Sequence, residues 1–166
     1  MDTIRTERLL LRRAKPGDLD AMHAVLSDPR AMRYWSTPPH ETIDETRAWL
    51  DDMIAAPADV SDDFVIEFEG AVIGKMGCWQ LPEIGFILHP RVWRQGIGRE
   101  ALHALLPWMF ARHAVPAITA DVDPRNTASL ALLSGAGFRE TGRAERTWFV
   151  AGEWCDSVYL ECPRPD

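Results

Sequence analysis

A turn with two glycines, Gly96 and Gly98, has the composition of an anion-binding site. It follows a short apolar run at residues 84–88 and precedes a segment, 97–112, whose apolar residues recur at helical spacing. Glycine lets a backbone bend sharply or approach a ligand closely. The first N–H groups of a helix have no partner within it and lie at the positive end of its dipole. Strand, glycine turn and helix together therefore predict a phosphate site.

Positive charge gathers around the same turn. The segment 89–113 contains four arginines and one glutamate, in a chain whose net charge is −7. These cations favour an anion at the turn. Glycine turns before helices are also common where nothing binds, and surface arginines often contact only solvent. This segment alone therefore leaves both interpretations open.

The whole chain has the composition of one globular domain, residues 1–166. With 46% hydrophobic and 26% charged residues, it shows no low-complexity run and no repeat. Its acidic balance argues against nucleic-acid binding. The charged N-terminus and the lack of a long apolar stretch argue against a signal peptide or membrane binding, so we expect a cytoplasmic protein. Cys78, Cys155 and Cys162 lack the spacing of metal ligands, and no metal is expected.

Periodicity predicts an α+β fold with a mixed sheet. Three consecutive strand signals indicate an antiparallel meander, and the strand, helix and strand between residues 84 and 122 indicate a parallel crossover. The last strand signals are typical of antiparallel pairing. We expect strands at residues 7–14, 64–68, 72–79, 84–88, 117–122, 138–141, 147–150 and 157–162, and helices at 19–28, 42–55, 97–112 and 127–135.

Several short motifs follow one another along nearly the whole chain. They are TERLLLR (6–12), EIGF (83–86), HP (89–90), WRQGIGREAL (93–102), DPRNTASL (123–130) and GFRETG (137–142). The ordered set resembles the GNAT superfamily of N-acetyltransferases, and in particular its RimJ/RimL-like branch. The resemblance implies a three-layer α/β/α domain, whose central sheet has antiparallel N-terminal strands and a splayed parallel pair in the middle.

The resemblance also implies transfer of an acetyl group from acetyl-CoA to a primary amine. In such enzymes the free edge of the strand before the turn pairs with the pantetheine arm, and a backbone N–H there stabilises the thioester oxyanion. The turn cradles the CoA pyrophosphate, as the anion site derived above would. By resemblance, the edge residues are Phe86, Ile87 and Leu88, and the cradle residues are Arg94, Gln95, Gly96, Ile97, Gly98 and Arg99.

Two positions depart from the common pattern of the superfamily. Trp93 stands where Arg or Gln is usual, as it often does in the RimJ/RimL-like branch, and backbone binding of phosphate does not depend on it. Leu133 stands where many members have a tyrosine that protonates the departing thiolate. Ser129 is our substitute for that acid, because it lies one helical turn beyond Asn126; an ordinary helix serine is the alternative. Asn126 could cap the helix and bind pantetheine, or cap it only.

The acceptor amine must lose a proton before it attacks, and Glu83 is the nominated base. A solvated carboxylate at the end of a strand is the alternative. Aromatic faces suit an ammonium group or an apolar side chain. Candidates for the acceptor pocket are therefore Tyr34 and Trp35, in an irregular segment 30–41, and Trp79. Trp148 and Trp154 are further candidates for its wall. Asp156 could anchor the amine or simply end a hairpin strand.

A protein N-terminal α-amine is the favoured acceptor, because of the RimJ/RimL-like resemblance. Similar chains acetylate amino acids, polyamines or antibiotics, and a non-catalytic acyl-CoA-binding module is a further alternative. A dinucleotide-binding domain fits poorly, because Ala101 occupies the third glycine position of that fingerprint. We expect a monomer or homodimer.

Overall fold

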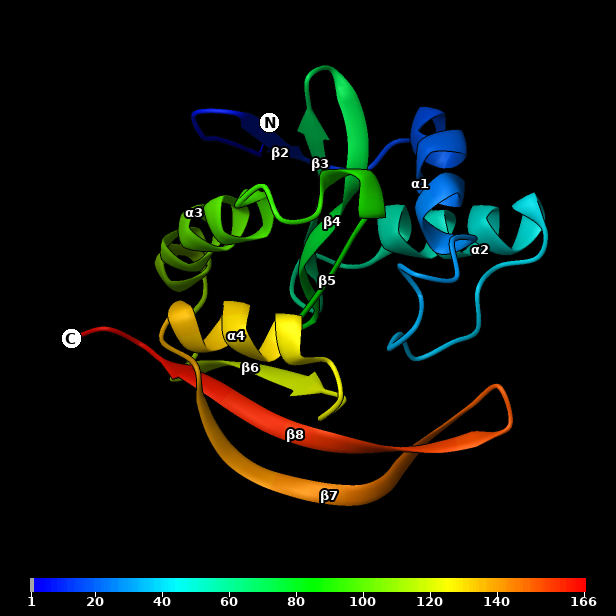
Figure 1. The fold of residues 1–166 in the computed structure, drawn as a ribbon. Coiled ribbons are helices and arrows are strands. Elements are labelled where there is room, and N and C mark those ends of the chain that lie inside the picture. Colours follow the sequence, from blue (N-terminus) through cyan, green and yellow to red (C-terminus); the bar gives the residue numbers. More distant parts are fainter. Residues whose placement is uncertain (1) are drawn as a thin grey trace.

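An eight-stranded mixed sheet runs through the molecule in the order β1-β2-β3-β4-β5-β6-β8-β7 (Figure 1). The computed structural model describes residues 2–166. The strands are β1 (Thr3–Arg5), β2 (Leu9–Arg12), β3 (Asp62–Phe68), β4 (Ala71–Gln80), β5 (Glu83–Leu88), β6 (Ala117–Val122), β7 (Arg139–Val150) and β8 (Glu153–Pro163). The helices are α1 (Leu19–Leu26), α2 (Ile43–Ala55), α3 (Ile97–Arg112) and α4 (Thr127–Gly135).

The sheet is antiparallel everywhere except in its middle. β5 and β6 are parallel and share a single Cα pair, Glu83 with Thr119, whereas β6 pairs with β8 along its whole length. The two parallel strands therefore separate beyond this pair. This arrangement confirms the predicted mixed sheet with a splayed parallel pair.

Helices cover both faces of the sheet, as predicted. The larger core lies beneath α3 and contains Phe64, Leu105 and Met109. A smaller core on the opposite face joins α1 and α2 to the sheet and contains Met22 and Ile87. Figure 1 shows α3 and α4 on one side of the sheet and α1 and α2 on the other. Alternating side chains of each strand therefore belong to different layers.

The start of α2 illustrates how local sequence determines a boundary. Thr42 is its N-cap: the hydroxyl accepts a hydrogen bond from the Glu45 N–H, and the Glu45 carboxylate accepts one from the Thr42 N–H. This capping box satisfies N–H groups that the helix leaves unpaired. The predicted helix at 42–55 is thus confirmed within one residue.

No helix within residues 2–166 is both long and apolar enough to cross a membrane.

Two strand predictions were wrong in extent. The expected strand 7–14 is the second arm of a hairpin, because the chain makes a tight turn in which the Thr6 N–H donates to the Leu9 carbonyl and the Thr6 hydroxyl accepts the Leu9 N–H. The expected strands 138–141 and 147–150 are one continuous strand, β7, paired with a β8 that already begins at Glu153. Two irregularities in the β7–β8 register interrupt the alternation of apolar residues along β7. The sequence pattern therefore predicted two short strands where the structure has one.

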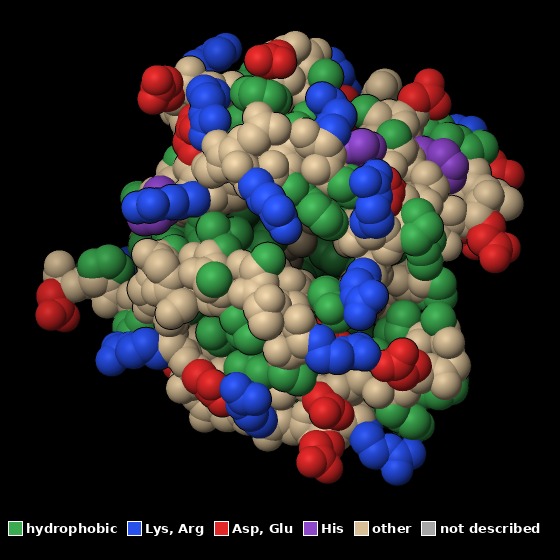
Figure 2. Space-filling model, viewed as in Figure 1, with side chains coloured by type: hydrophobic (Ala, Val, Ile, Leu, Met, Phe, Trp, Pro, Cys, Tyr) green, Lys and Arg blue, Asp and Glu red, His purple; other side chains and the backbone are tan. Residues whose placement is uncertain are grey.

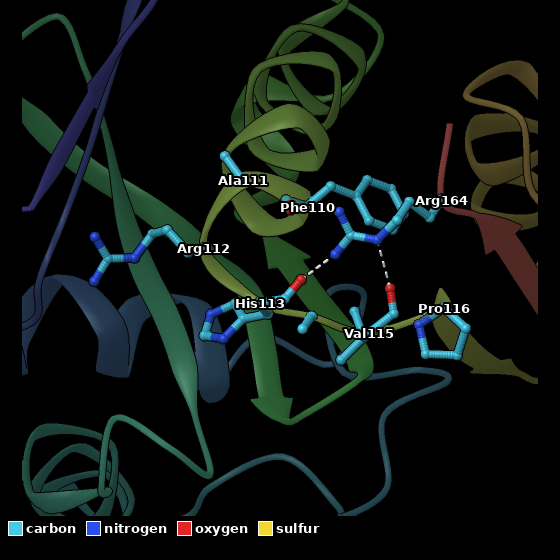
Figure 3. Close-up of a pocket in the computed structure, with 8 residues that line it drawn as sticks. Phe110, Ala111, Arg112, His113, Val115, Pro116 and Arg164 are labelled. Atoms are coloured by element: carbon cyan, nitrogen blue, oxygen red, sulfur yellow. Dashed lines mark hydrogen bonds between the residues drawn. The ribbon is translucent and has the colours of Figure 1, made fainter. Parts of the chain in front are cut away.

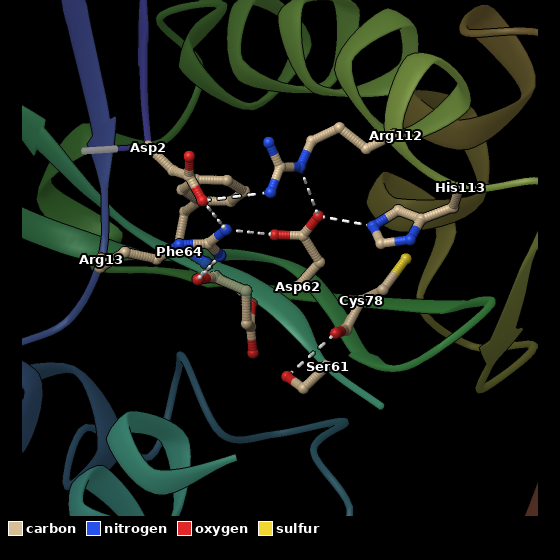
Figure 4. A network of polar contacts seen from close by, with 9 residues as sticks. Asp2, Arg13, Ser61, Asp62, Phe64, Cys78, Arg112 and His113 are labelled. Carbon is tan, nitrogen blue, oxygen red and sulfur yellow. Dashed lines mark hydrogen bonds and ion pairs between the residues drawn. The ribbon is translucent and has the colours of Figure 1, made fainter. Parts of the chain in front are cut away.

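A polar network fastens the far end of α3 to the sheet. Asp62 at the start of β3 lies 2.6 Å from Arg13 Nη2 and 2.6 Å from His113 Nε2, and Asp2 bridges Arg13 and Arg112 (Figure 4). Beside it, the Arg164 guanidinium donates hydrogen bonds to main-chain carbonyls at the end of α3 and lines an open pocket of about 480 Å³ (Figure 3). These contacts close the carboxyl end of α3, opposite the glycine turn.

Candidate active site

The gap between β5 and β6 exposes one edge of β5. The Thr119 N–H donates to the Pro82 carbonyl (3.0 Å) across the gap, whereas the His89 N–H donates to Ile73 of β4 (2.8 Å). Because backbone groups of successive strand residues point to opposite sides, those of Phe86 and Leu88 face the gap. The backbone of Ile87 faces β4, and its side chain packs in the smaller core. Two of the three predicted edge residues thus present N–H groups to the gap.

Trp93 closes the end of this edge. Its indole N–H donates to the Leu88 carbonyl over 3.0 Å, and the residue is 44% exposed. The carbonyl of the last β5 residue is therefore already paired, while the Leu88 N–H remains directed into the gap. In the sequence, Trp93 stood out only as a departure from the common motif; the structure shows that its side chain fixes the junction of strand and turn.

The turn itself is tightly wound. Arg94 (φ +61°) and Gly96 (φ +74°) both adopt left-handed conformations, and Gly96 is the N-cap of α3. The Gln95 side chain donates to the Arg91 carbonyl (3.1 Å), and the His89 ring accepts a hydrogen bond from the Arg91 N–H (3.1 Å). The first N–H groups of α3 therefore lie at the end of the open β5 edge.

Helix α4 lies close to this turn through Leu132. A Cβ atom at Gly98 would lie 3.2 Å from Leu132 Cδ2, so a larger residue there would require the Leu132 side chain to shift by a few tenths of an ångström. Asn126 caps α4 by accepting the Ser129 N–H with its side-chain oxygen (3.2 Å), and its amide NH₂ stays available for a ligand. Ser129 is half-buried. Leu133 is fully buried in the larger core, where a tyrosine hydroxyl would need a polar partner.

Glu83 lies at the head of the gap. Its carboxylate accepts a 2.7 Å hydrogen bond from the Trp79 indole. Burial raises the pKa of Glu83 above its ordinary value, and the charge of Asp121 raises it further, against the opposing effect of the Trp79 hydrogen bond. A carboxylate with a raised pKa at the start of the open edge has the chemistry of a general base.

Asp121 of β6 is a carboxylate that the sequence analysis missed. It accepts a hydrogen bond from the Trp148 indole (3.1 Å), so it forms a second carboxylate–indole pair across the gap from Glu83 and Trp79. The alternation of apolar and polar residues at 117–122 is the sequence pattern that could have identified Asp121. Ile118, Ala120 and Val122 are buried in the larger core. The Asp121 side chain therefore lies on the opposite face of the sheet, the same face as Glu83.

The other predicted acceptor residues lie around this face at different depths. The Tyr34 ring makes cation–π contacts with the guanidinium groups of Arg33 (5.1 Å) and Arg125 (5.5 Å), and the second contact joins the α1–α2 connection to the entry of α4. Trp35 packs against the smaller core. The Asp156 carboxylate accepts the Arg146 N–H (2.9 Å) at an irregularity of the β7–β8 hairpin. Asp156 therefore stabilises the hairpin, whatever else it contacts.

Figure 2 shows a hollow in the molecule at the position of β5, lined with hydrophobic side chains and bordered by positively charged side chains. Such a border suits a ligand with phosphate groups. The pocket at the carboxyl end of α3 and a second one on the outer face of α4 and β7 lie elsewhere, and neither contains Glu83, Asn126 or the glycine turn. The open edge, the turn and the carboxylates therefore define the candidate active site.

The family model of the acetyltransferase (GNAT) domain matches residues 8–139. The chain belongs to the GNAT acetyltransferase family. An uncharacterized N-acetyltransferase, p20 of Bacillus licheniformis, is 30% identical over 155 residues, which cover 86% of this chain and 85% of that protein. The chain is accordingly an N-acetyltransferase, and the recognition of its GNAT fold from sequence is confirmed.

Solved GNAT structures share the fold over nearly the full chain. An acetyltransferase of Bacillus anthracis is 25% identical with a TM-score of 0.86, covering 99% of this chain and 100% of that one. A RimL ribosomal L7/L12 α-N-protein acetyltransferase with coenzyme A is 20% identical (TM-score 0.86; 98% of each chain). Spermidine N-acetyltransferase of Vibrio cholerae, with CoA and spermine, is 23% identical (TM-score 0.82; 96% and 97%). Enzymes for both kinds of acceptor therefore share this fold.

Proposed function

We propose that this chain transfers the acetyl group of acetyl-CoA to a protein N-terminal α-amine, by direct attack of the amine on the thioester. One observation carries the proposal: an unpaired strand edge continues into a helix N-terminus, with a carboxylate of raised pKa at the opposite end of that edge. The edge fits the amide-bearing pantetheine arm, and the glycine turn fits a pyrophosphate.

Each site residue has a definite task in this proposal. Acetyl-CoA supplies an activated thioester carbonyl. N–H groups of Phe86 and Leu88 hydrogen-bond to the bound arm and to the oxygen that becomes negative during attack. Glu83 accepts a proton from the acceptor ammonium group, directly or through one water. Ser129 donates a proton to the departing sulfur, while Asn126 holds the start of α4 in place.

The strength of the proposed base supports an α-amine as the acceptor. An α-amine, with a pKa of about 7.7 to 8.0, is deprotonated more easily than a lysine side chain at about 10.4. A single carboxylate with a raised pKa matches the weaker demand. The structural likeness to the RimL enzyme supports the same choice of acceptor.

A polycationic small amine is the second candidate, and Asp121 favours it. Two carboxylates, Glu83 and Asp121, each hydrogen-bonded to an indole, lie on one face of the gap. Carboxylates and aromatic faces both attract ammonium groups. The likeness to spermidine N-acetyltransferase points the same way.

Acetyl-CoA should raise the melting temperature of the protein in a concentration-dependent way. At a hundredfold excess over Kd, binding to the folded state stabilises it by about 2.7 kcal/mol. Differential scanning fluorimetry with acetyl-CoA, and with NAD as a control, measures this. Stabilisation by NAD and not by acetyl-CoA would contradict the proposal.

A thiol-release assay then separates the acceptors. Peptides with free α-amines should release CoA faster than Nα-acetylated peptides of the same sequence that keep an internal lysine. A higher kcat/KM for spermidine than for any peptide would favour the second candidate. Binding of acetyl-CoA without thiol release from any acceptor would favour a non-catalytic acyl-CoA-binding module.

Replacing Ser129 with alanine should lower kcat about 10²-fold, because the departing thiolate loses its proton donor. The affinity for acetyl-CoA, measured by calorimetry, should stay nearly unchanged. Ser134→Ala is the matched control, since Ser134 is an exposed serine of the same helix. An unchanged kcat in Ser129→Ala would remove Ser129 as the acid.

A further inference from the structure

We propose that Arg8 is a positioning residue that holds the glycine turn in the conformation that binds the pyrophosphate. This inference rests on the proposed use of acetyl-CoA. Arg8 lies in the turn between β1 and β2, far from α3 in sequence, and its side chain is 37% exposed. It therefore adds little to the core and contacts the turn from outside.

The first contact sets the direction of a peptide group. Arg8 Nη1 donates to the Gln95 carbonyl over 2.9 Å. In a planar trans peptide, the C=O of Gln95 and the N–H of Gly96 point in opposite directions. By holding this carbonyl on the outer side, Arg8 directs the Gly96 N–H away from itself and towards the ligand side of the turn.

The second contact neutralises an unfavourable charge. Glu100 lies in the first turn of α3, where its carboxylate would repel a phosphate. It accepts hydrogen bonds from Arg8 Nε (2.7 Å), from the Arg8 N–H (2.9 Å) and from the Thr6 hydroxyl (2.6 Å). Burial by itself would raise the pKa of Glu100, but these hydrogen bonds outweigh it and hold the pKa below its ordinary value. Glu100 therefore stays ionised, and Arg8 compensates its charge.

Both contacts come from one rigid guanidinium group. Its fork binds the Gln95 carbonyl and the Glu100 carboxylate at once, and Nη2 lies 3.5 Å from the place of a Cβ atom on Gly96. Thr6 fixes the other side of Glu100 and caps the β1–β2 turn by accepting the Leu9 N–H (3.0 Å). The N-terminal hairpin thus supports the glycine turn through Arg8 and Thr6.

The test compares two acetyl donors. Arg8→Ala should raise KM for acetyl-CoA about tenfold with kcat nearly unchanged, because a hydrogen-bonded support of the turn is lost. S-acetylpantetheine lacks the pyrophosphate, so its kcat/KM should be the same in the variant and the parent. Arg5→Ala, an exposed arginine of the same hairpin, should change neither donor. An equal loss with both donors, or no loss with either, overturns the inference.

A second variant tests the charge-compensating part of the inference. In Arg8→Ala/Glu100→Gln the repelling charge is also removed, so KM for acetyl-CoA should recover at least about threefold relative to Arg8→Ala. No recovery would show that the Glu100 charge does not oppose binding of the phosphate, which overturns the charge-compensating part of the inference. A parent protein that binds no acetyl-CoA would contradict the proposed function, whereas binding that is insensitive to Arg8 contradicts only this inference.

Discussion

Replacing Glu83 with glutamine should lower kcat/KM for the amine acceptor by about 10²- to 10⁴-fold, the usual contribution of a general base. Glutamine keeps the size of the side chain and can still accept the Trp79 hydrogen bond, so the pocket should remain intact. Steady-state thiol release with a peptide acceptor measures the loss. Glu69→Gln, in the exposed turn between β3 and β4, is the control and should retain full activity.

The pH profile gives an independent check on the same residue. Glu83 acts as a base only when ionised, so activity should fall as the pH drops through its pKa, which lies above the ordinary glutamate value. Asp121→Asn removes a negative charge that raises this pKa; the pKa of Glu83 should fall, and the acidic limb should move to lower pH. The acceptor amine ionises in the same way in assays of the parent protein and of Asp121→Asn, so it does not affect the difference between their pH profiles. A limb that stays in place or moves to higher pH would argue against Glu83 as the base.

Replacing Lys75 with methionine should lower the free energy of unfolding by about 3–5 kcal/mol. The ammonium group of Lys75 lies 2.8 Å from Asp63, and the two side chains are only 2% and 7% exposed. Methionine fills most of the space but leaves the Asp63 carboxylate buried without its cation. Urea denaturation followed by circular dichroism measures the change.

An exposed ion pair of the same protein provides the comparison. Arg47 and Asp44 lie 3.8 Å apart on α2 and are 52% and 87% exposed. Arg47→Met should cost about 0–1 kcal/mol, because solvent screens this pair. Lys75→Met/Asp63→Leu, which removes both buried charges, should recover most of the stability that Lys75→Met loses. A loss below about 1 kcal/mol in Lys75→Met would show that water reaches Asp63.

Local patterns predicted those parts of the site that lie close together in sequence. The glycine turn, the strand before it and the helix after it form one segment, residues 84–112, and their relation depends on backbone propensities and helix capping. Asn126 at the start of α4 and the capping box of Thr42 are similar cases, since each satisfies N–H groups within three residues. The motif order then led to the GNAT family.

Contacts between distant segments needed the tertiary structure. Arg8 contacts the glycine turn although 87 positions separate it from Gln95 in the sequence, and Asp121 becomes part of the candidate site only because β6 lies beside β5. The β7 strand continues through its two irregularities because β8 pairs with it on both sides of them, and the sequence of β7 alone does not predict this pairing. The sequence by itself thus determined the fold class and the strand, glycine turn and helix at residues 84–112, which depend on local backbone chemistry. Only the tertiary structure decided which charged side chains surround them, because long-range pairing leaves no periodic trace in the chain.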